Sequence, residues 1–280
     1  MKAIGVDLGG TNVRCGLVEN EKIINLLGKS INSSGTETEI LNDIFLLLDD
    51  LVSDDIEGIG IGVPSVVDVE NGIVYDVYNI PSWKSVPIKS ILEKRYNKPV
   101  YVNNDANCFA LGEKYFGKAK NYNNIVGLII GTGLGAGIII NGKLYNGTNC
   151  GAGEFGMIPF KDDILEHYCS GYFFKKKYNT TGEELYKLAL NKDEFALNVF
   201  REYGKNLGEG IKIILYAIDP EIIVMGGSVS KSFKYFKDAL FETISDFGYP
   251  KSLEKLKIEV SDVENVAILG AVGLLMDKDF

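Results

Sequence analysis

The sequence is poor in histidine, cysteine and proline: its 280 residues include one His, four Cys and seven Pro. A single histidine, His167, excludes most metal centres and acid–base schemes that combine several imidazoles. Cys169, two residues further on, adds only one more potential zinc ligand, which is too few for a structural site. The cysteines form no C-x-x-C pair and are expected to be reduced, mostly buried thiols: Cys15, Cys108, Cys150 and Cys169.

Positive charge and long apolar runs are also scarce. The 29 basic residues are outnumbered by 38 acidic ones, which gives a net charge of −9 at pH 7 and argues against nucleic acid as the main partner. No run of about 18 apolar residues occurs, and the N-terminus lacks the basic-then-apolar pattern of a signal segment. We therefore expect a cytoplasmic protein with no membrane partner. Its length allows two ordinary domains or one large domain with a substantial core.

Glycine, in contrast, is concentrated in one unusual stretch. Residues 131–137 read GTGLGAG between two apolar strands, although glycine inside a strand weakens it. A similar strand, glycine turn with a threonine, and strand occur at residues 5–18, GVDLGGTNVRCGLV. Backbone N–H groups in such turns can form concave nests that bind anions, and two facing nests could hold a polyphosphate. Two unrelated hairpins with glycine turns are the alternative.

Other segments predict an α/β organisation. Apolar residues recur at helical spacing over 39–52, which indicates an amphipathic helix. Residues 99–113, PVYVNNDANCFALGE, predict a strand followed by a helix that Asn104 or Asp105 would cap. Residues 219–233 predict a buried strand, a Gly-Gly turn and a helix start, a layout found at nucleotide sites. The apolar helix predicted over 267–276 could cross back to the first domain.

These segments together carry a family resemblance. The motifs GVDLGGTNVR, GVPSVVD, NIPSW, VNNDANCFALGE, GTGLGAG, GEFGM, LEHYCSG and DPEIIVMGGSVS follow one another over essentially the whole chain. In this order they resemble the ROK family of repressors and sugar kinases. The resemblance implies the two-domain α/β fold of actin/hexokinase-like ATPases, with ribonuclease H-like halves and a cleft between them. It implies an N-terminal domain over 1–104, completed by a helix over 266–280, and a C-terminal domain over 105–265 that carries the adenosine site and a dimer surface.

The resemblance also implies an activity: ATP-dependent phosphorylation of a sugar hydroxyl, usually O6, in the presence of Mg²⁺. Asp105 is then the general base that accepts the hydroxyl proton, unless it serves only as a helix cap. Asp7 is expected to orient Mg²⁺, usually through water. The expected phosphate contacts are Gly9, Gly10, Thr11, Asn12, Gly131, Thr132 and Gly133, with Gly226 and Gly227 at the adenosine. The expected sugar contacts, besides Asp105, are Ser65, Asn79, Asn104, Glu154, Met157 and Glu166.

The chain departs from the family pattern at the sugar site. Many ROK kinases read G-E-x-G-H where this chain reads GEFGM, so Met157 replaces a histidine that contacts sugar and zinc. Only eight residues separate Met157 from Glu166, which leaves no room for the family's cysteine-rich zinc loop, and no structural zinc is expected. Ser65 stands where many members have glycine.

The motifs are compatible with more than one sugar substrate. Short members without zinc and with this substitution resemble bacterial N-acetylmannosamine kinases of sialic acid breakdown, and an adaptable methionine tolerates an acetamido methyl group. We favour N-acetylmannosamine; glucose is the main alternative, and N-acetylglucosamine and fructose stay open. A repressor would need a DNA-binding segment before the first hairpin, which begins at Gly5. A silent sugar sensor or a chaperone-like ATPase would not need Asp7, Asp105 and the sugar-side residues together. A homodimer is expected, as is usual for the family.

Overall fold

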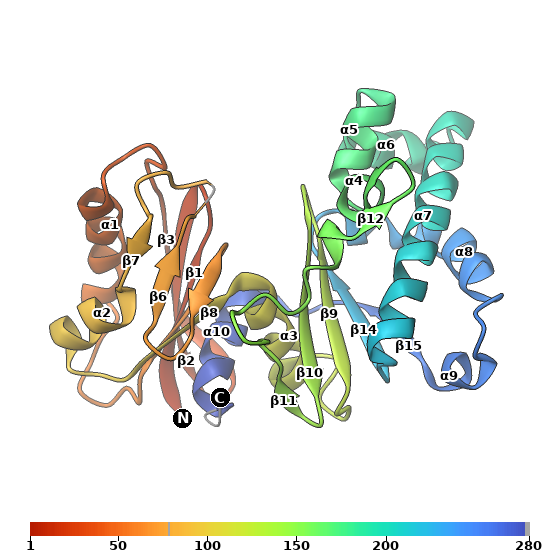
Figure 1. Ribbon diagram of the computed structural model, residues 1–280. Helices are drawn as coiled ribbons and strands as arrows, with labels where there is room; N and C mark the ends of the chain where they lie inside the picture. The colour runs from red at the N-terminus through yellow and green to blue at the C-terminus, as the bar shows by residue number, and fades with distance from the viewer. Residues whose placement is uncertain (78, 278–280) are drawn as a thin grey trace. The chain divides into compact units, whose positions relative to one another are not determined.

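The chain folds into two compact units, and the computed structural model describes residues 1–77 and 79–277 (Figure 1). Unit 1 comprises Met1–Asn121, Gly137–Ala152 and the described residues from Asp262 onward, and unit 2 comprises Tyr122–Ala136 and Gly153–Ser261. Residues 278–280 of the predicted C-terminal helix lie outside the described residues. Within the described ranges, no helix combines the length and the apolar character needed to cross a bilayer.

Unit 1 is built on a five-stranded mixed sheet. Its strands, in the order β3-β2-β1-β4-β8, are β3 (Lys22–Ser30), β2 (Asn12–Glu19), β1 (Lys2–Leu8), β4 (Ile59–Val63) and β8 (Val100–Asn104). The first three form an antiparallel meander, whereas β4 is parallel to both β1 and β8. The carboxyl ends of β1, β4 and β8 therefore meet at one edge of the sheet, which is where ligands bind in open α/β sheets.

Two layers of helices cover this sheet. Figure 1 shows α1 (Glu37–Asp49) and α2 (Ile88–Tyr96) on one side and α10 (Val266–Met276) on the other. The side of α1 and α2 also carries a small sheet of β5 (Val66–Asp68), β6 (Ile73–Tyr75) and β7 (Ser85–Val86). Alternation along β1 explains the two layers, because Ile4, Val6 and Leu8 join the core with α1 and α2, whereas Ala3 joins α10.

The helix α10 packs backbone against backbone on the sheet. A Cβ atom at Gly60 would lie 1.8 Å from the carbonyl oxygen of Ala271, and one at Gly5 would lie 2.1 Å from that of Ile268. Helix α3 (Asp105–Phe116) is equally close, because a Cβ atom at Gly270 would lie 1.6 Å from the carbonyl oxygen of Cys108. This packing places α3 in unit 1, although the sequence analysis had assigned it to the second domain.

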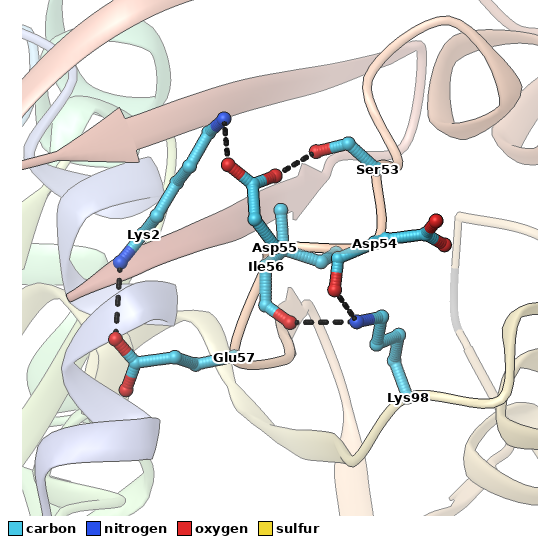
Figure 2. A network of polar contacts seen from close by, with 7 residues as sticks. All are labelled: Lys2, Ser53, Asp54, Asp55, Ile56, Glu57 and Lys98. Carbon is cyan, nitrogen blue, oxygen red and sulfur yellow. Dashed lines mark hydrogen bonds and ion pairs between the residues drawn. The ribbon is translucent and has the colours of Figure 1, made fainter.

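Polar contacts hold the loop that leads into β4 (Figure 2). The Lys2 ammonium lies 2.8 Å from the Asp55 carboxylate, and its backbone N–H donates to Glu57 at 3.2 Å. The Lys98 ammonium donates to the carbonyl of Ile56 at 3.0 Å. The hydrogen bond from Lys2 is the main reason that the pKa of Asp55 falls to about 2. The start of β1 and the residues before β8 are thus both fastened to this loop.

Unit 2 contains most of the helices and, from the second sheet, β9, β14, β15 and the start of β10. The strand order is β11-β10-β9-β14-β15, with β11 (Lys143–Leu144), β10 (Leu134–Ile140), β9 (Ile125–Ile130), β14 (Ile222–Gly226) and β15 (Lys257–Val260). The chain passes into unit 1 at Gly137, within β10, and β11 belongs to unit 1. The helices are α4 (Leu165–Cys169), α5 (Gly171–Tyr178), α6 (Gly182–Leu190), α7 (Glu194–Ile218), α8 (Phe233–Ile244) and α9 (Pro250–Lys255). Two short strands, β12 (Pro159–Phe160) and β13 (Asp163–Ile164), precede α4.

The contact between α10 and β4 gives the first prediction. Replacement of Gly60 by alanine places a methyl group against the backbone of α10, so we expect the free energy of unfolding to fall by about 3 kcal/mol or more. Gly151→Ala is the matched control, because a Cβ atom there meets nothing within 4 Å, and its effect should stay within about 0.5 kcal/mol. Urea denaturation measures both; equal stabilities of the two variants would contradict the packing.

Candidate functional site

The first glycine hairpin of unit 1 borders a cavity of about 530 Å³. Its turn joins β1 to β2, and the N–H of Gly9 donates to the carbonyl oxygen of Asn12 at 2.8 Å. A Cβ atom at Gly10 would lie 2.6 Å from the Cβ of Asn79, so only glycine allows Asn79 this close to the turn. The cavity is lined by Asp7, Gly9, Thr11, Asn12, Arg14, Gly28, Lys29 and Ser30.

Two cations of this cavity were missed by the sequence analysis. The guanidinium of Arg14 lies 2.5 Å from the Asp7 carboxylate, and the ammonium of Lys29 lies 2.7 Å from the carboxylate of Asp43. Arg14 is the cross-strand partner of Asp7 on β1 and of Gly28 on β3. The residue spacing of the predicted hairpin could have shown that Arg14 lies opposite Asp7. The position of Lys29 at the cavity depends instead on how the third strand pairs with the second, which the sequence does not show. Their charges suit an anionic ligand.

The donor set of the cavity fits a magnesium ion held together with phosphate and water. Among the described residues, no group of three or more His, Cys, Asp and Glu side chains could hold a metal ion. Mg²⁺ usually keeps several waters and takes only one or two carboxylates, with substrate phosphates as the other ligands. Asp7, which lines the cavity and is partly committed to Arg14, would hold such an ion. The expected absence of zinc stays a prediction.

The junction of β8 and α3 carries Asn104 and Asp105. Asn104 is the N-cap, as predicted: its side chain accepts a hydrogen bond from the N–H of Ala106 at 2.8 Å. It also donates to the carbonyl oxygen of Ser65 at 3.3 Å, which brings two predicted sugar contacts together. Asp105 opens the helix and accepts from the same N–H at 2.8 Å. The helix N-terminus stabilises a negative charge at this position.

A buried amide network lies behind this junction. Asn103, which is fully buried, accepts hydrogen bonds at 2.8 Å from the N–H of Asn104 and from the side chain of Asn107. It donates to the side chain of Asn146 at 2.9 Å. No role was predicted for these asparagines, although the polar run at the end of an apolar strand was a signal in the sequence. The network fixes the backbone from which Asp105 projects.

In unit 2, the second glycine hairpin meets Glu166. The turn between β9 and β10 closes through the N–H of Gly131, which donates to the carbonyl oxygen of Gly133 at 3.0 Å. Glu166 accepts from the N–H of Leu134 at 2.9 Å, and a Cβ atom at Gly133 would lie 2.6 Å from the same carboxylate oxygen. The structure thus brings Glu166, a predicted sugar contact, to the turn that contains Thr132.

Glu154 precedes a short 3-10 turn, Phe155–Met157, and Met157 is its last residue. Partial burial and the charge of Glu166 raise the pKa of the Glu154 carboxyl group. Met157 is 60% exposed, so its side chain has room to contact a ligand. Gly226 is the last residue of β14 and Gly227 follows it; Gly227 has φ +88°, and a Cβ atom there would lie 2.3 Å from the carbonyl oxygen of Ile130. The Gly-Gly turn therefore lies beside the strand that enters the second hairpin.

Comparison with known proteins identifies the family. The model of the ROK family matches residues 3–278. The chain belongs to the ROK family. Solved ROK structures confirm the predicted actin/hexokinase-like fold: a glucokinase from Streptomyces griseus, in complex with glucose and AMPPNP, has a TM-score of 0.80 and is 26% identical, with 98% of this chain and 99% of that chain covered. The Lmo2764 protein of Listeria monocytogenes, provisionally assigned as an N-acetylmannosamine kinase, has a TM-score of 0.84 at 28% identity over the whole of both chains.

Curated ROK proteins of two kinds are similar in sequence. A glucokinase of Thermotoga maritima is 30% identical, over 99% of this chain and 98% of its own length. A xylose repressor of Caldicellulosiruptor bescii is also 30% identical, over 98% of this chain and 77% of its own length. Membership of the ROK family alone therefore does not separate a kinase from a regulator, and residues of the site must decide.

The charges of the first cavity give the second prediction. We expect Arg14→Ala to weaken binding of Mg²⁺–AMPPNP by about tenfold or more, because a charged hydrogen-bond donor is lost and the Asp7 carboxylate loses its partner. Arg95→Ala is the control: Arg95 is similarly exposed, belongs to the same unit and pairs with Asp49 at 2.6 Å. Titration calorimetry measures both variants, and equal affinities would contradict a role of Arg14 in this cavity.

Proposed function

We propose that the chain is an ATP-dependent sugar kinase that transfers the γ-phosphate to the O6 hydroxyl of a hexose or N-acetylhexosamine. The observation that carries this proposal is the β8–α3 junction, where Asp105 stands at the N-terminus of a helix whose cap, Asn104, is tied to Ser65. A regulator that only senses sugar has no need of a carboxylate that accepts a proton. ATP and a free sugar are the proposed substrates.

In this proposal Asp105 accepts the proton of the sugar hydroxyl. The hydroxyl oxygen bonds to the γ-phosphorus of ATP, and the bond between the γ-phosphorus and the leaving ADP oxygen breaks. Phosphoryl transfer needs positioning and stabilisation of charge more than a strong nucleophile. Arg14 and Lys29 in unit 1, and the backbone N–H groups of the two glycine turns, would supply positive charge and hydrogen bonds to the phosphates. Mg²⁺, when bound, would neutralise charge on the phosphate oxygens, with Asp7 as its protein ligand or as a partner of its waters.

The relatives support a sugar kinase and leave its sugar undecided. The relatives described above include two glucokinases, one of which was solved with glucose and AMPPNP. We favour N-acetylmannosamine, with glucose as the alternative, because Met157 offers an exposed apolar side chain and no N–H group. Apolar contacts discriminate by only about 1–3 kcal/mol, so detectable turnover of both sugars is expected. The similarity to xylose repressors keeps a non-catalytic sugar sensor as the less favoured alternative.

The role of Asp105 gives the third prediction. We expect Asp105→Asn to lower kcat by about 10²–10⁴-fold while sugar affinity stays nearly unchanged, because the amide keeps the shape and loses the proton acceptor. Asp193→Asn is the control, since Asp193 also stands at a helix N-terminus, as the cap of α7. Steady-state kinetics with the best of a dozen sugars measures both variants. A loss smaller than tenfold in Asp105→Asn would show that Asp105 is not the base.

The substitution at Met157 gives the fourth prediction. We expect Met157→His to shift the ratio of kcat/KM values toward glucose and away from N-acetylmannosamine by about tenfold, because an imidazole N–H can donate to a sugar hydroxyl. Met276→His, a second exposed methionine, is the control and should leave the ratio unchanged. Wild-type protein that phosphorylates glucose rapidly and no N-acetylated sugar would refute the preferred substrate and leave the kinase proposal intact.

A further inference from the structure

The junction between α4 and α5 holds the second glycine hairpin from behind. The hydroxyl of Ser170 donates to the carbonyl oxygen of Thr132 at 2.9 Å, and the N–H of Gly171 donates to the carbonyl oxygen of Gly131 at 2.8 Å. Both acceptors belong to the turn itself. Two carbonyl oxygens of the turn expected to bind phosphate are therefore hydrogen-bonded to the α4–α5 junction, while the N–H of Gly131 closes the turn onto Gly133.

Both residues are fitted closely to this contact. Ser170 is fully buried and also caps α5, where its hydroxyl oxygen accepts from the N–H of Tyr172 at 3.1 Å. A Cβ atom at Gly171 would lie 2.8 Å from the carbonyl oxygen of Gly131, which is closer than real Cβ atoms approach. Any side chain at residue 171 would therefore push the hairpin away.

The same segment contacts the hairpin at its far end. Glu166, four residues before Ser170, accepts from the N–H of Leu134 at 2.9 Å. Residues 166–171 thus bind the first residue of the turn, Gly131, and the first residue of β10, Leu134, so the hairpin has little freedom to change shape without moving α4 and α5. This segment carries the proposed sugar contact and the support of the proposed phosphate turn on one short stretch of chain.

We infer that Ser170 and Gly171 are positioning residues, which hold residues 131–133 in the conformation that binds the nucleotide phosphates. The inference rests on the proposed function, because it takes ATP as the ligand of this turn. Neither residue touches the ligand; both act through the backbone of the hairpin.

A purely structural role in helix capping is the alternative, and the chain offers a matched control for it. Thr181 caps α6 in the same unit, with its side chain accepting from the N–H of Glu184 at 3.1 Å. Gly182 follows it as Gly171 follows Ser170, but a Cβ atom there would meet only the ring of Phe174, at 3.3 Å. Substitutions at Thr181 and Gly182 therefore disturb the start of α6 without contacting the second glycine hairpin.

The test compares Ser170→Ala with Thr181→Ala. We expect Ser170→Ala to weaken Mg²⁺–AMPPNP binding by about five- to tenfold, the effect of one lost hydrogen bond, and Thr181→Ala to change it by less than about twofold. Adenosine, which has no phosphate, should bind both variants as it binds the wild-type protein. A second pair of variants covers the case that Ser170→Ala fails to fold. Gly171→Ala should weaken Mg²⁺–AMPPNP binding, and Gly182→Ala should leave it nearly unchanged. Equal AMPPNP affinities within both pairs, or equal losses for adenosine and AMPPNP, would overturn the inference.

Amide hydrogen exchange separates this inference from the proposed function. Peptides that cover residues 128–136 should exchange faster in Ser170→Ala than in Thr181→Ala, with or without nucleotide. Unchanged exchange in this region would overturn the inference even if the protein is a kinase. Failure of wild-type protein to bind AMPPNP would instead refute the proposed function, and the exchange data would still show whether Ser170 holds the hairpin.

Discussion

The structure of unit 1 depends on the close approach of one helix backbone to a sheet. Helix α10 lies so near to β1, β4 and α3 that glycine is required at Gly5, Gly60 and Gly270. The last described helix of the chain therefore completes the unit that begins at residue 1, and it fixes α3, the helix that starts at Asp105. Because α3 is packed backbone against backbone on α10, the Asp105 carboxylate projects from a rigid helix, and a rigid position suits the proton acceptor that we propose.

Glycine has the same physical use at the two glycine hairpins and at the Gly-Gly turn. At Gly10 it admits Asn79, at Gly133 it admits the Glu166 carboxylate, and at Gly227 it admits the carbonyl of Ile130. Each glycine lets a polar group or a backbone segment come close to a turn, and the N–H groups of the two hairpin turns can bind an anion. The glycine-rich motifs therefore allow short distances between neighbouring segments. A side chain at Gly10, Gly133 or Gly227 would push the adjacent residues away from the turn.

Local patterns predicted much of the fold, and pairings over long sequence distances were predicted poorly. The strand–turn–strand of residues 127–140 and the cap at Asn104 follow from turn chemistry and capping rules, and both are confirmed. The placement of α3 in unit 1 was missed, because it depends on contacts with α10, some 160 residues away. Lys29 and Ser170 were missed for the same reason: one reaches the first cavity through strand register, and the other reaches Thr132 across 38 residues.

We propose that this ROK chain transfers phosphate from ATP to a sugar, and sugar-dependent release of ADP tests this proposal most directly. Purified protein is incubated with ATP and Mg²⁺, alone and with glucose or N-acetylmannosamine, and ADP and sugar phosphate are both quantified. We predict that ADP forms rapidly only when a sugar is present and in equal amount to the sugar phosphate. ADP release that no sugar changes, or nucleotide binding without turnover on any sugar, would contradict the claim and favour a sensor or a different ATPase.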